Sequence, residues 1–266
     1  MEKLKNRNIL ILLGVIVVAG LVILLFKKKE ALDTTPTVVN TPVITSTDSV
    51  PKKQDTVTAS GASNNPKYTG RDPEEVHPNP DDVKIFSEKR KEEIYSGITV
   101  HGRNVKENPD FLNGWLELGI LKKVIGDYEG ARDAWEYANI IRPGNSISFS
   151  NLGELYWRYL PNYTKSEANF KTSIKNKSDD PSVYISLSDL YFYSYAEKKD
   201  FADDILLEGT KANPEDTNLV RALAALYERQ KEYTKAKEWW TKLLEKEPND
   251  AEITAHIKGL GEKINP

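Results

Sequence analysis

Cysteine is absent from the 266-residue chain, and histidine occurs only as His77, His101 and His256. The lack of cysteine excludes disulfides, thiolate metal sites, a cysteine nucleophile and attachment through a lipidated cysteine. The histidines lie far apart and have no second histidine at metal-ligand spacing, which argues against a zinc or nucleophilic site. A glycine-rich phosphate loop is also absent from the sequence. We therefore expect no metal, no cofactor and no catalytic residue, and a protein that is not an enzyme.

Charge of neither sign dominates. The chain has 37 lysines and arginines against 40 aspartates and glutamates, which gives a formal net charge of -3. A balance this close provides no long-range field that would attract a polyanion. Composition therefore indicates no nucleic-acid partner.

The longest stretch without a charged residue covers residues 9–26 and reads ILILLGVIVVAGLVILLF. As a helix with a rise of about 1.5 Å per residue it would be about 27 Å long, just enough to span a bilayer. A cleaved signal peptide shares the basic start and the apolar run. This run, however, is too long and is followed by Lys27, Lys28 and Lys29 rather than by the small residues of a cleavage site. The sequence therefore predicts an uncleaved transmembrane helix.

The orientation of this helix depends on its basic flanks, which carry three basic side chains on each side. The free amino terminus adds a further positive group to residues 1–8, which we interpret as a short cytoplasmic tail. This predicts a single-pass protein of the cell membrane with its amino terminus inside and its body outside the cytoplasm. The inverted topology is the alternative.

Residues 27–80 follow as a segment rich in Thr, Ser, Pro and Asn, with almost no aromatic residues. Such a composition buries too little apolar surface to offset the entropy of ordering. We expect a disordered linker with a root-mean-square reach on the order of 40 Å. The folded domain is expected to cover residues 81–266.

Within residues 81–266 the sequence repeats itself about every 34 residues. The clearest unit, residues 112–145, contains Trp115, Leu118, Gly119, Gly126, Asp127, Tyr128, Ala131, Trp135, Ala138 and Pro143. A second unit, residues 217–250, contains Leu223, Ala224, Tyr227, Tyr233, Ala236, Trp240, Leu243 and Pro248 at the same spacing. The pattern resembles the tetratricopeptide repeat (TPR), in which small residues stand where two helices cross. The resemblance implies an all-α solenoid of helical hairpins.

Two degenerate units lie between these two. They keep part of the pattern, with Phe149, Leu152, Gly153, Tyr156, Phe170 and Ser173 in the first and Tyr184, Leu187, Ser188, Tyr191, Ala202, Leu206, Gly209 and Pro214 in the second. The first carries an extra residue near Pro161 and the second about two extra residues within 197–200. Because insertions in repeat proteins map to loops, we expect them in the inner turns of the hairpins.

Both ends of the repeat region carry expected capping helices. A helix over residues 83–108 precedes the first full unit, with Gly97 where a close helix crossing needs a small residue. A final helix presents Ile253, Ile257, Leu260 and Ile264 on one face, which would cover the last repeat. The acidic pairs Asp81-Asp82, Asp179-Asp180 and Asp203-Asp204 could serve as general acid and base or as calcium ligands. Two of the three, however, stand at or just before an expected helix start, so we expect them to act as caps.

The resemblance also implies a partner-binding site, because TPR proteins hold peptides in a concave groove lined by the first helix of each repeat. Carried over position by position, the groove consists of Leu116, Ile120, Val124, Glu154, Trp157, Arg158, Ile185, Asp189, Phe192, Tyr193, Arg221, Glu228 and Arg229, with Lys123, Ser150 and Ala225 beside them. Leu116 and Ile120 stand where the chaperone-binding branch of the family needs Lys and Asn, so that branch is not expected. The apolar and aromatic members predict a hydrophobic peptide or an amphipathic helix as ligand. Alternatively, Trp157 and Phe192 pack beneath the irregular inner turns.

These features predict a membrane-tethered scaffold for protein–protein interaction that acts outside the cytoplasm during envelope complex assembly or secretion. The prediction of the pathway rests on analogy of architecture. One alternative is a membrane adaptor that faces the cytoplasm. Another is a non-catalytic docking subunit of an envelope enzyme.

Overall fold

The computed structural model describes residues 65–265, and within them all regular structure is helical. The elements are α2 (Pro80–Val83), α3 (Glu88–Glu107), α4 (Leu112–Val124), α5 (Tyr128–Ile141), α6 (Ile147–Arg158), α7 (Tyr163–Asn176), α8 (Pro181–Tyr193), η1 (Ala196–Phe201), α9 (Ala202–Ala212), α10 (Thr217–Arg229), α11 (Tyr233–Lys246) and α12 (Ala251–Ile264). The predicted tail 1–8, the apolar segment 9–26 and the linker up to residue 64 lie outside the described residues. Among residues 65–265, no helix combines the length and the apolar character that crossing a bilayer requires.

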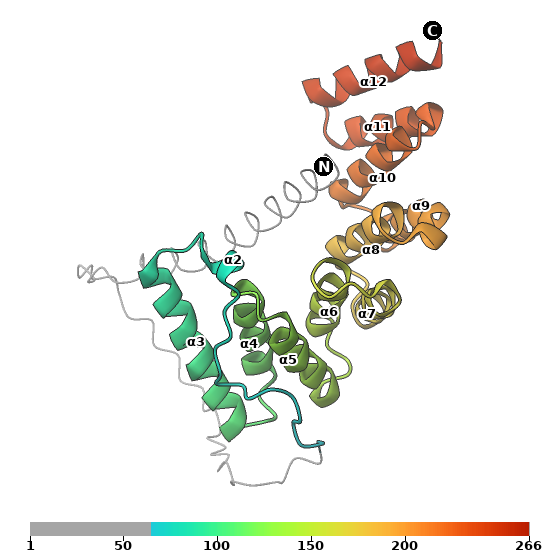
Figure 1. Cartoon of the computed structure of the whole chain (residues 1–266). Helices are drawn as coiled ribbons and strands as arrows, with labels where there is room; N and C mark the ends of the chain where they lie inside the picture. The colour runs from blue at the N-terminus through green and yellow to red at the C-terminus, as the bar shows by residue number, and fades with distance from the viewer. Residues whose placement is uncertain (1–64, 266) are drawn as a thin grey trace, which may run out of the picture. The chain divides into compact units, whose positions relative to one another are not determined.

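The helices form hairpins that stack in chain order. The pairs α4/α5, α6/α7, α8/α9 and α10/α11 are the repeat units, with α3 ahead of them and α12 behind them (Figure 1). Side chains that accept hydrogen bonds from backbone amides of the first turn begin most of these helices: Ser87, Asp127, Asn162, Asp180, Asp216 and Asp250. The predicted all-α helical-hairpin solenoid is confirmed for this part of the chain.

Small residues stand where the two helices of a hairpin cross, as the repeat pattern predicted. A Cβ atom on Gly119 of α4 would overlap the indole ring of Trp135, whose Nε1 donates to the carbonyl oxygen of Leu116 at 3.1 Å. Ala131 of α5 and Ala236 of α11 are fully buried at the equivalent position of the second helices. The two helices of a hairpin thus pack so closely at the crossing that larger side chains do not fit there.

The inner turns of the two degenerate hairpins hold the predicted insertions. The α6/α7 turn covers residues 159–162, compared with 125–127 in α4/α5 and 230–232 in α10/α11. In α8/α9 the longer insertion forms η1. The regular turns place one residue in the left-handed region, Gly126 at φ 79° and Lys231 at φ 64°. Glycine adopts this conformation without steric cost, whereas the Cβ atom of a lysine makes it strained.

The expected boundary between linker and domain at residue 81 is wrong for the described part of the linker. Residues 65–79, here called the strap, run across α4 between α3 and α5, with one turn in which the amide of Glu75 donates to the carbonyl of Asp72 (Figure 1). The Tyr68 ring packs on Trp115 and Tyr137, with ring centroids 4.7 and 5.3 Å away. Pro73 is buried. Composition predicted disorder here, but aromatic and ionic contacts with helices far along the chain order the strap.

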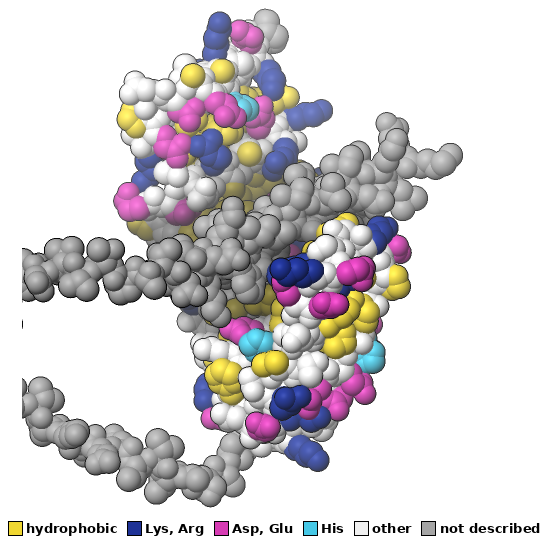
Figure 2. Space-filling view, turned by 90° about the vertical axis from the view of Figure 1, so that its left-hand side faces the viewer, with side chains coloured by type: hydrophobic (Ala, Val, Ile, Leu, Met, Phe, Trp, Pro, Cys, Tyr) yellow, Lys and Arg dark blue, Asp and Glu magenta, His cyan; other side chains and the backbone are white. Residues whose placement is uncertain are grey.

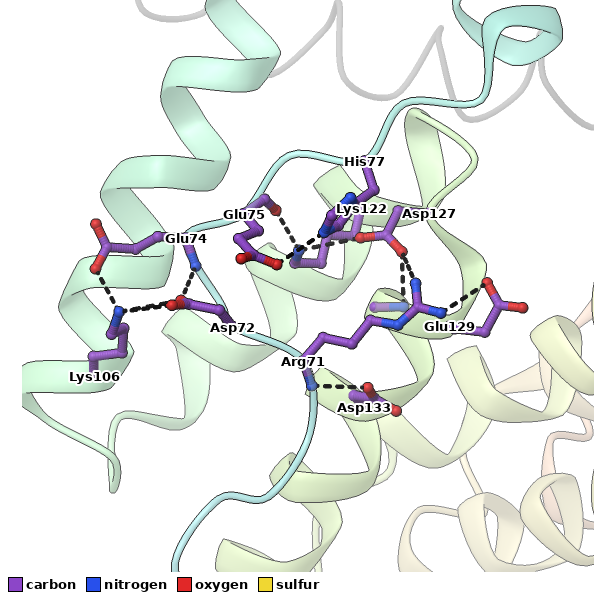
Figure 3. Close-up of polar contacts among 11 residues, drawn as sticks. Arg71, Asp72, Glu74, Glu75, His77, Lys106, Lys122, Asp127, Glu129 and Asp133 are labelled. Atoms are coloured by element: carbon purple, nitrogen blue, oxygen red, sulfur yellow. Dashed lines mark hydrogen bonds and ion pairs between the residues drawn. The ribbon is translucent and has the colours of Figure 1, made fainter.

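The strap also completes a buried ionic cluster, shown in Figure 3. The Lys122 side chain is 1% exposed, and its ammonium donates to Oδ2 of Asp127 at 3.1 Å and to the backbone carbonyl of Glu75 at 2.8 Å. Oδ1 of Asp127 accepts from Nη1 of Arg71 at 3.0 Å. Lys106 of α3 pairs with Asp72 at 3.1 Å at the outer edge of the cluster. The ammonium and the carboxylate are therefore buried with partners, two of which the strap supplies.

Lys122 stands at a position that carries tyrosine in the three later repeats. The residue three places after the crossing position is Lys122 in α4, Tyr156 in α6, Tyr191 in α8 and Tyr227 in α10. Each tyrosine hydroxyl donates to a carboxylate on the second helix of the preceding hairpin, Glu136 at 2.7 Å, Glu167 at 2.7 Å and Asp203 at 3.1 Å respectively. Burial and these carboxylates raise the pKa of all three tyrosines well above the usual value. Neighbouring hairpins are thus joined by a recurring hydroxyl-to-carboxylate bond.

The acidic pairs only partly act as helix caps. Asp180 caps α8, where its Oδ1 accepts from the amide of Ser182 at 3.1 Å. Asp203 instead accepts from Tyr227, and Asp82 accepts from the hydroxyl of Tyr128 at 2.9 Å. These two carboxylates therefore join separate elements.

The terminal helices cover the ends of the core as expected. Ile94, Ile98 and Val105 of α3 are buried against the first repeat. In α12, Ile253 and Leu260 are buried against the last repeat. Each terminal helix thus closes one end of the apolar core, and α12 leaves its polar residues exposed.

Candidate partner-binding face

The first helices of the four hairpins, α4, α6, α8 and α10, carry all residues of the predicted groove. Helix α8 contacts both α6 and α10, and Lys123 of α4 pairs with Glu154 of α6, so these four helices lie side by side in chain order. We call this surface the first-helix face. It comprises Leu116, Ile120, Val124, Glu154, Trp157, Arg158, Ile185, Asp189, Phe192, Tyr193, Arg221, Glu228 and Arg229.

The members of the first-helix face differ widely in exposure. Leu116 is 7% exposed and belongs to the apolar core with Trp115 and Leu118. Arg158, Tyr193 and Arg229 are exposed, and Tyr193 is the most open of the large apolar side chains here at 56%. The remaining members, apart from Trp157, are partly exposed. A partner can therefore reach the ends of α6, α8 and α10 more readily than the start of α4.

Trp157 is only 9% exposed and packs with the core of the later repeats. Its Nε1 donates to the hydroxyl of Ser194 at 2.8 Å, which links the end of α6 to the turn after α8. Phe192 is partly buried against the same core. These positions agree with the alternative in which Trp157 packs beneath an inner turn, and they leave its ring little surface for a partner.

Charged residues on this face are partly paired with one another. Nζ of Lys123 lies 3.1 Å from Oε2 of Glu154, and Nε of Arg158 lies 3.9 Å from Oε1 of the same carboxylate. Arg221 of α10 forms a close pair with Glu247, with 2.6 Å between Nη2 and Oε2. These pairs neutralise much of the charge at both ends of the face.

The end of α8 is aromatic, and the carboxylate one helical turn before it is unpaired among the described residues. Phe192 and Tyr193 pack edge to face at 4.9 Å, and the guanidinium carbon of Arg229 lies 5.8 Å from the Tyr193 ring centroid. Asp189, one helical turn before Tyr193, makes no hydrogen bond or ion pair with any residue in 65–265. Burial raises the pKa of Asp189, and the charges of Arg229 and Arg158 oppose that rise.

Two residues near the face were missed by the sequence reasoning. Ser194 fixes the ring of Trp157, and Lys199 of η1 places its ammonium 5.1 Å from the ring centroid of Phe192. Both lie in or next to the insertion between α8 and α9, which has no counterpart in the repeat pattern. The insertion was visible in the sequence, but a register carried over from regular repeats assigns no position to its residues.

A second candidate site lies beneath the strap. A cleft of about 1040 Å³ lies between the strap and the helices and is lined by Tyr68, Asp72, Lys106, Trp115 and Tyr137 among others. Its three aromatic rings pack on one another at 4.7 to 5.3 Å. The described residues contain no group of three or more His, Asp or Glu side chains arranged to hold a metal ion. The aromatic rings here serve to hold the strap.

Both surfaces lie on a protein whose charges are mixed. Figure 2 shows one side of the molecule, on which basic and acidic side chains alternate and apolar patches lie between them. Binding at any such patch therefore depends on local arrangement rather than on the overall charge.

Comparisons with known proteins identify the fold. No protein-family model and no curated protein matches the chain. The crystal structure of MamA is similar, with a TM-score of 0.51 and 17% identity over 62% of this chain and 94% of MamA. YrrB, described as a TPR protein with an unusual peptide-binding site, gives a TM-score of 0.47 and 14% identity over 62% of this chain and 84% of YrrB. TTC0263, a thermophilic TPR protein of Thermus thermophilus, gives 0.45 and 17% over 67% and 94%. At these identities the likeness concerns the fold alone, which is the helical-hairpin solenoid that the sequence predicted.

Proposed function

We propose that this chain, a solenoid of the TPR type, is a scaffold that binds a hydrophobic peptide or an amphipathic helix of another protein on its first-helix face. The exposed Tyr193, packed against Phe192 at the end of α8, carries the proposal. An aromatic ring held in place by its neighbours contributes contact area at little entropic cost. No catalytic residue enters into this proposal.

A photo-crosslinking amino acid at position 193 tests the binding surface. We expect crosslinked adducts of defined mass from the full-length chain in its native membrane fraction. The matched control places the same group at Lys171, which is exposed on the second helix α7. Adducts of equal yield from both positions, or from neither, would contradict the proposal.

The proposal includes a membrane tether formed by residues 9–26 and a body outside the cytoplasm. It is supported by the uninterrupted apolar run and its basic flanks. Protease added to spheroplasts should cut within residues 30–64 and release a folded fragment that contains α3 to α12. Protection of the whole chain until lysis would instead indicate an adaptor that faces the cytoplasm.

A further inference from the structure

The last residues of the four first helices form a row across the face. Helix α4 ends at Val124, α6 at Arg158, α8 at Tyr193 and α10 at Arg229. The exposed aromatic ring therefore lies between two arginines of neighbouring hairpins. The negative ends of the helix dipoles stabilise guanidinium groups at these positions.

The two arginines keep most of their hydrogen-bonding capacity. Within residues 65–265, Arg229 forms no hydrogen bond or ion pair, and its guanidinium carbon lies near the Tyr193 ring. Arg158 stacks on Trp157 at 3.7 Å, and its only carboxylate within 4 Å among these residues is that of Glu154, at 3.9 Å. Glu154 is itself paired more closely with Lys123. Both guanidinium groups are thus held by aromatic rings rather than used up in ion pairs.

The charges around Tyr193 are mainly positive. Lys199 over Phe192 adds a third cation. Against these stands the carboxylate of Asp189, one turn deeper between the two arginines. The other two acidic residues of the first-helix face already have partners: Glu154 pairs with Lys123, and Glu228 pairs with His256 and Lys263 of α12.

We propose that this row binds an acidic segment of the partner protein, in which carboxylates on either side of a bulky apolar side chain meet Arg158 and Arg229 while the apolar side chain covers Tyr193. This rests on the proposed function and specifies the chemistry of its ligand. A guanidinium group offers a planar pair of N–H donors that matches the two oxygens of a carboxylate.

Fluorescence anisotropy with three labelled 12-residue peptides tests the proposal on the full-length chain in detergent. The first peptide has Asp and Glu around Phe and Leu, the second replaces the acids with Asn and Gln, and the third replaces them with Lys. We expect the acidic peptide to bind about tenfold more tightly than the amide peptide, because charge-assisted bonds are about twice as strong as neutral ones. Unfolding curves of each protein variant show whether it remains folded.

Variants of the row give effects of opposite sign. Arg158→Gln and Arg229→Gln should each weaken binding of the acidic peptide about fivefold to tenfold. Asp189→Asn should strengthen it about twofold to threefold, because it removes a like charge. Arg103→Gln on α3 is the matched control, and it should change little because this exposed arginine lies outside the first-helix face, with its Nε 3.8 Å from Oε2 of Glu74.

The outcomes separate this inference from the proposed function. Equal binding of the acidic and amide peptides, both lost in Tyr193→Ala, would overturn the acidic partner and leave the hydrophobic binding face. Weaker binding of the acidic peptide in Asp189→Asn, or a preference for the lysine peptide, would show that the row binds a cationic group and would overturn the inference. Binding of phosphatidylglycerol vesicles through both arginines, with no binding of any peptide, would assign the row to a membrane surface and overturn the inference. Binding of neither peptides nor vesicles would remove the proposed function as well.

Discussion

Replacing Asp127 by alanine is expected to destabilise the fold far more than replacing its partner Lys122 by methionine. The Asp127 carboxylate accepts from Lys122 at 3.1 Å, from Arg71 at 3.0 Å and from the amide of Gly130 at 3.0 Å. When it is removed, the buried ammonium of Lys122 keeps only one of its two acceptors, the backbone carbonyl of Glu75 at 2.8 Å. An uncompensated buried charge costs about 3–5 kcal/mol, and the lost helix cap adds about 1 kcal/mol.

The substitution Lys122→Met is expected to cost less stability. In Lys122→Met the Asp127 carboxylate still has Arg71 and the amide of Gly130, so no buried charge stands alone. Methionine also fills the space of the aliphatic part of lysine. We expect a loss of about 1–2 kcal/mol, and we expect the double variant to be more stable than Asp127→Ala alone by about 2 kcal/mol.

Urea unfolding of the full-length chain in detergent, followed by circular dichroism, measures these differences. The matched control is Asp216→Ala, which removes a cap from α10 whose side chain accepts from the amide of Leu219 at 2.9 Å. That control should cost about 1 kcal/mol. Two results would refute the account of the buried pair: Asp127→Ala costs no more than Asp216→Ala, or the double variant is less stable than both Asp127→Ala and Lys122→Met.

Three further substitutions test packing and turn geometry by thermal unfolding. Ala131→Leu should cost about 1–3 kcal/mol because its site is fully buried at a helix crossing, whereas Ala168→Leu on the exposed side of α7 should change little. Trp157→Ala should cost about 3–5 kcal/mol because the ring is buried and hydrogen-bonded, whereas Tyr193→Ala should cost less than about 0.5 kcal/mol; the reverse order would place Trp157 on the binding surface. Lys231→Gly should raise stability by about 0.5–1 kcal/mol because it relieves the left-handed backbone, and a lower melting temperature would contradict this reading of the turn.

The hairpins could be predicted because their determinants are local. Gly119 and Trp135 fall at the spacing that a helix crossing requires, and Asp127 precedes α5 as a cap. Extra residues near Pro161 indicated a longer turn, which the structure has at residues 159–162. Each of these signals lies within one repeat, where sequence distance and spatial distance agree.

The strap and the burial of Trp157 could not be predicted in the same way. Tyr68 contacts Tyr137, 69 positions later in the numbering, and a segment rich in Pro and Asn gives no sign of such a partner. The ring of Trp157 was placed by the repeat register, but its contact with Ser194 depends on an insertion outside that register. Lys122 at a tyrosine position was a visible departure, although its acceptors, Asp127 and the carbonyl of Glu75, become evident only in three dimensions.

The recurring bond between a tyrosine and the preceding hairpin bears on how such an array can lengthen. If the α6/α7 hairpin were duplicated, each copy would bring both a tyrosine hydroxyl and an acidic second helix, because Tyr156 bonds backward and Glu167 accepts from the next repeat. The new junction between the two copies would therefore have both the tyrosine hydroxyl as donor and the carboxylate as acceptor. A duplicated α4/α5 would instead place Lys122 at an inner junction without the strap carbonyl that it needs. We expect gene duplication to extend this protein from its interior, and to leave the first hairpin unique.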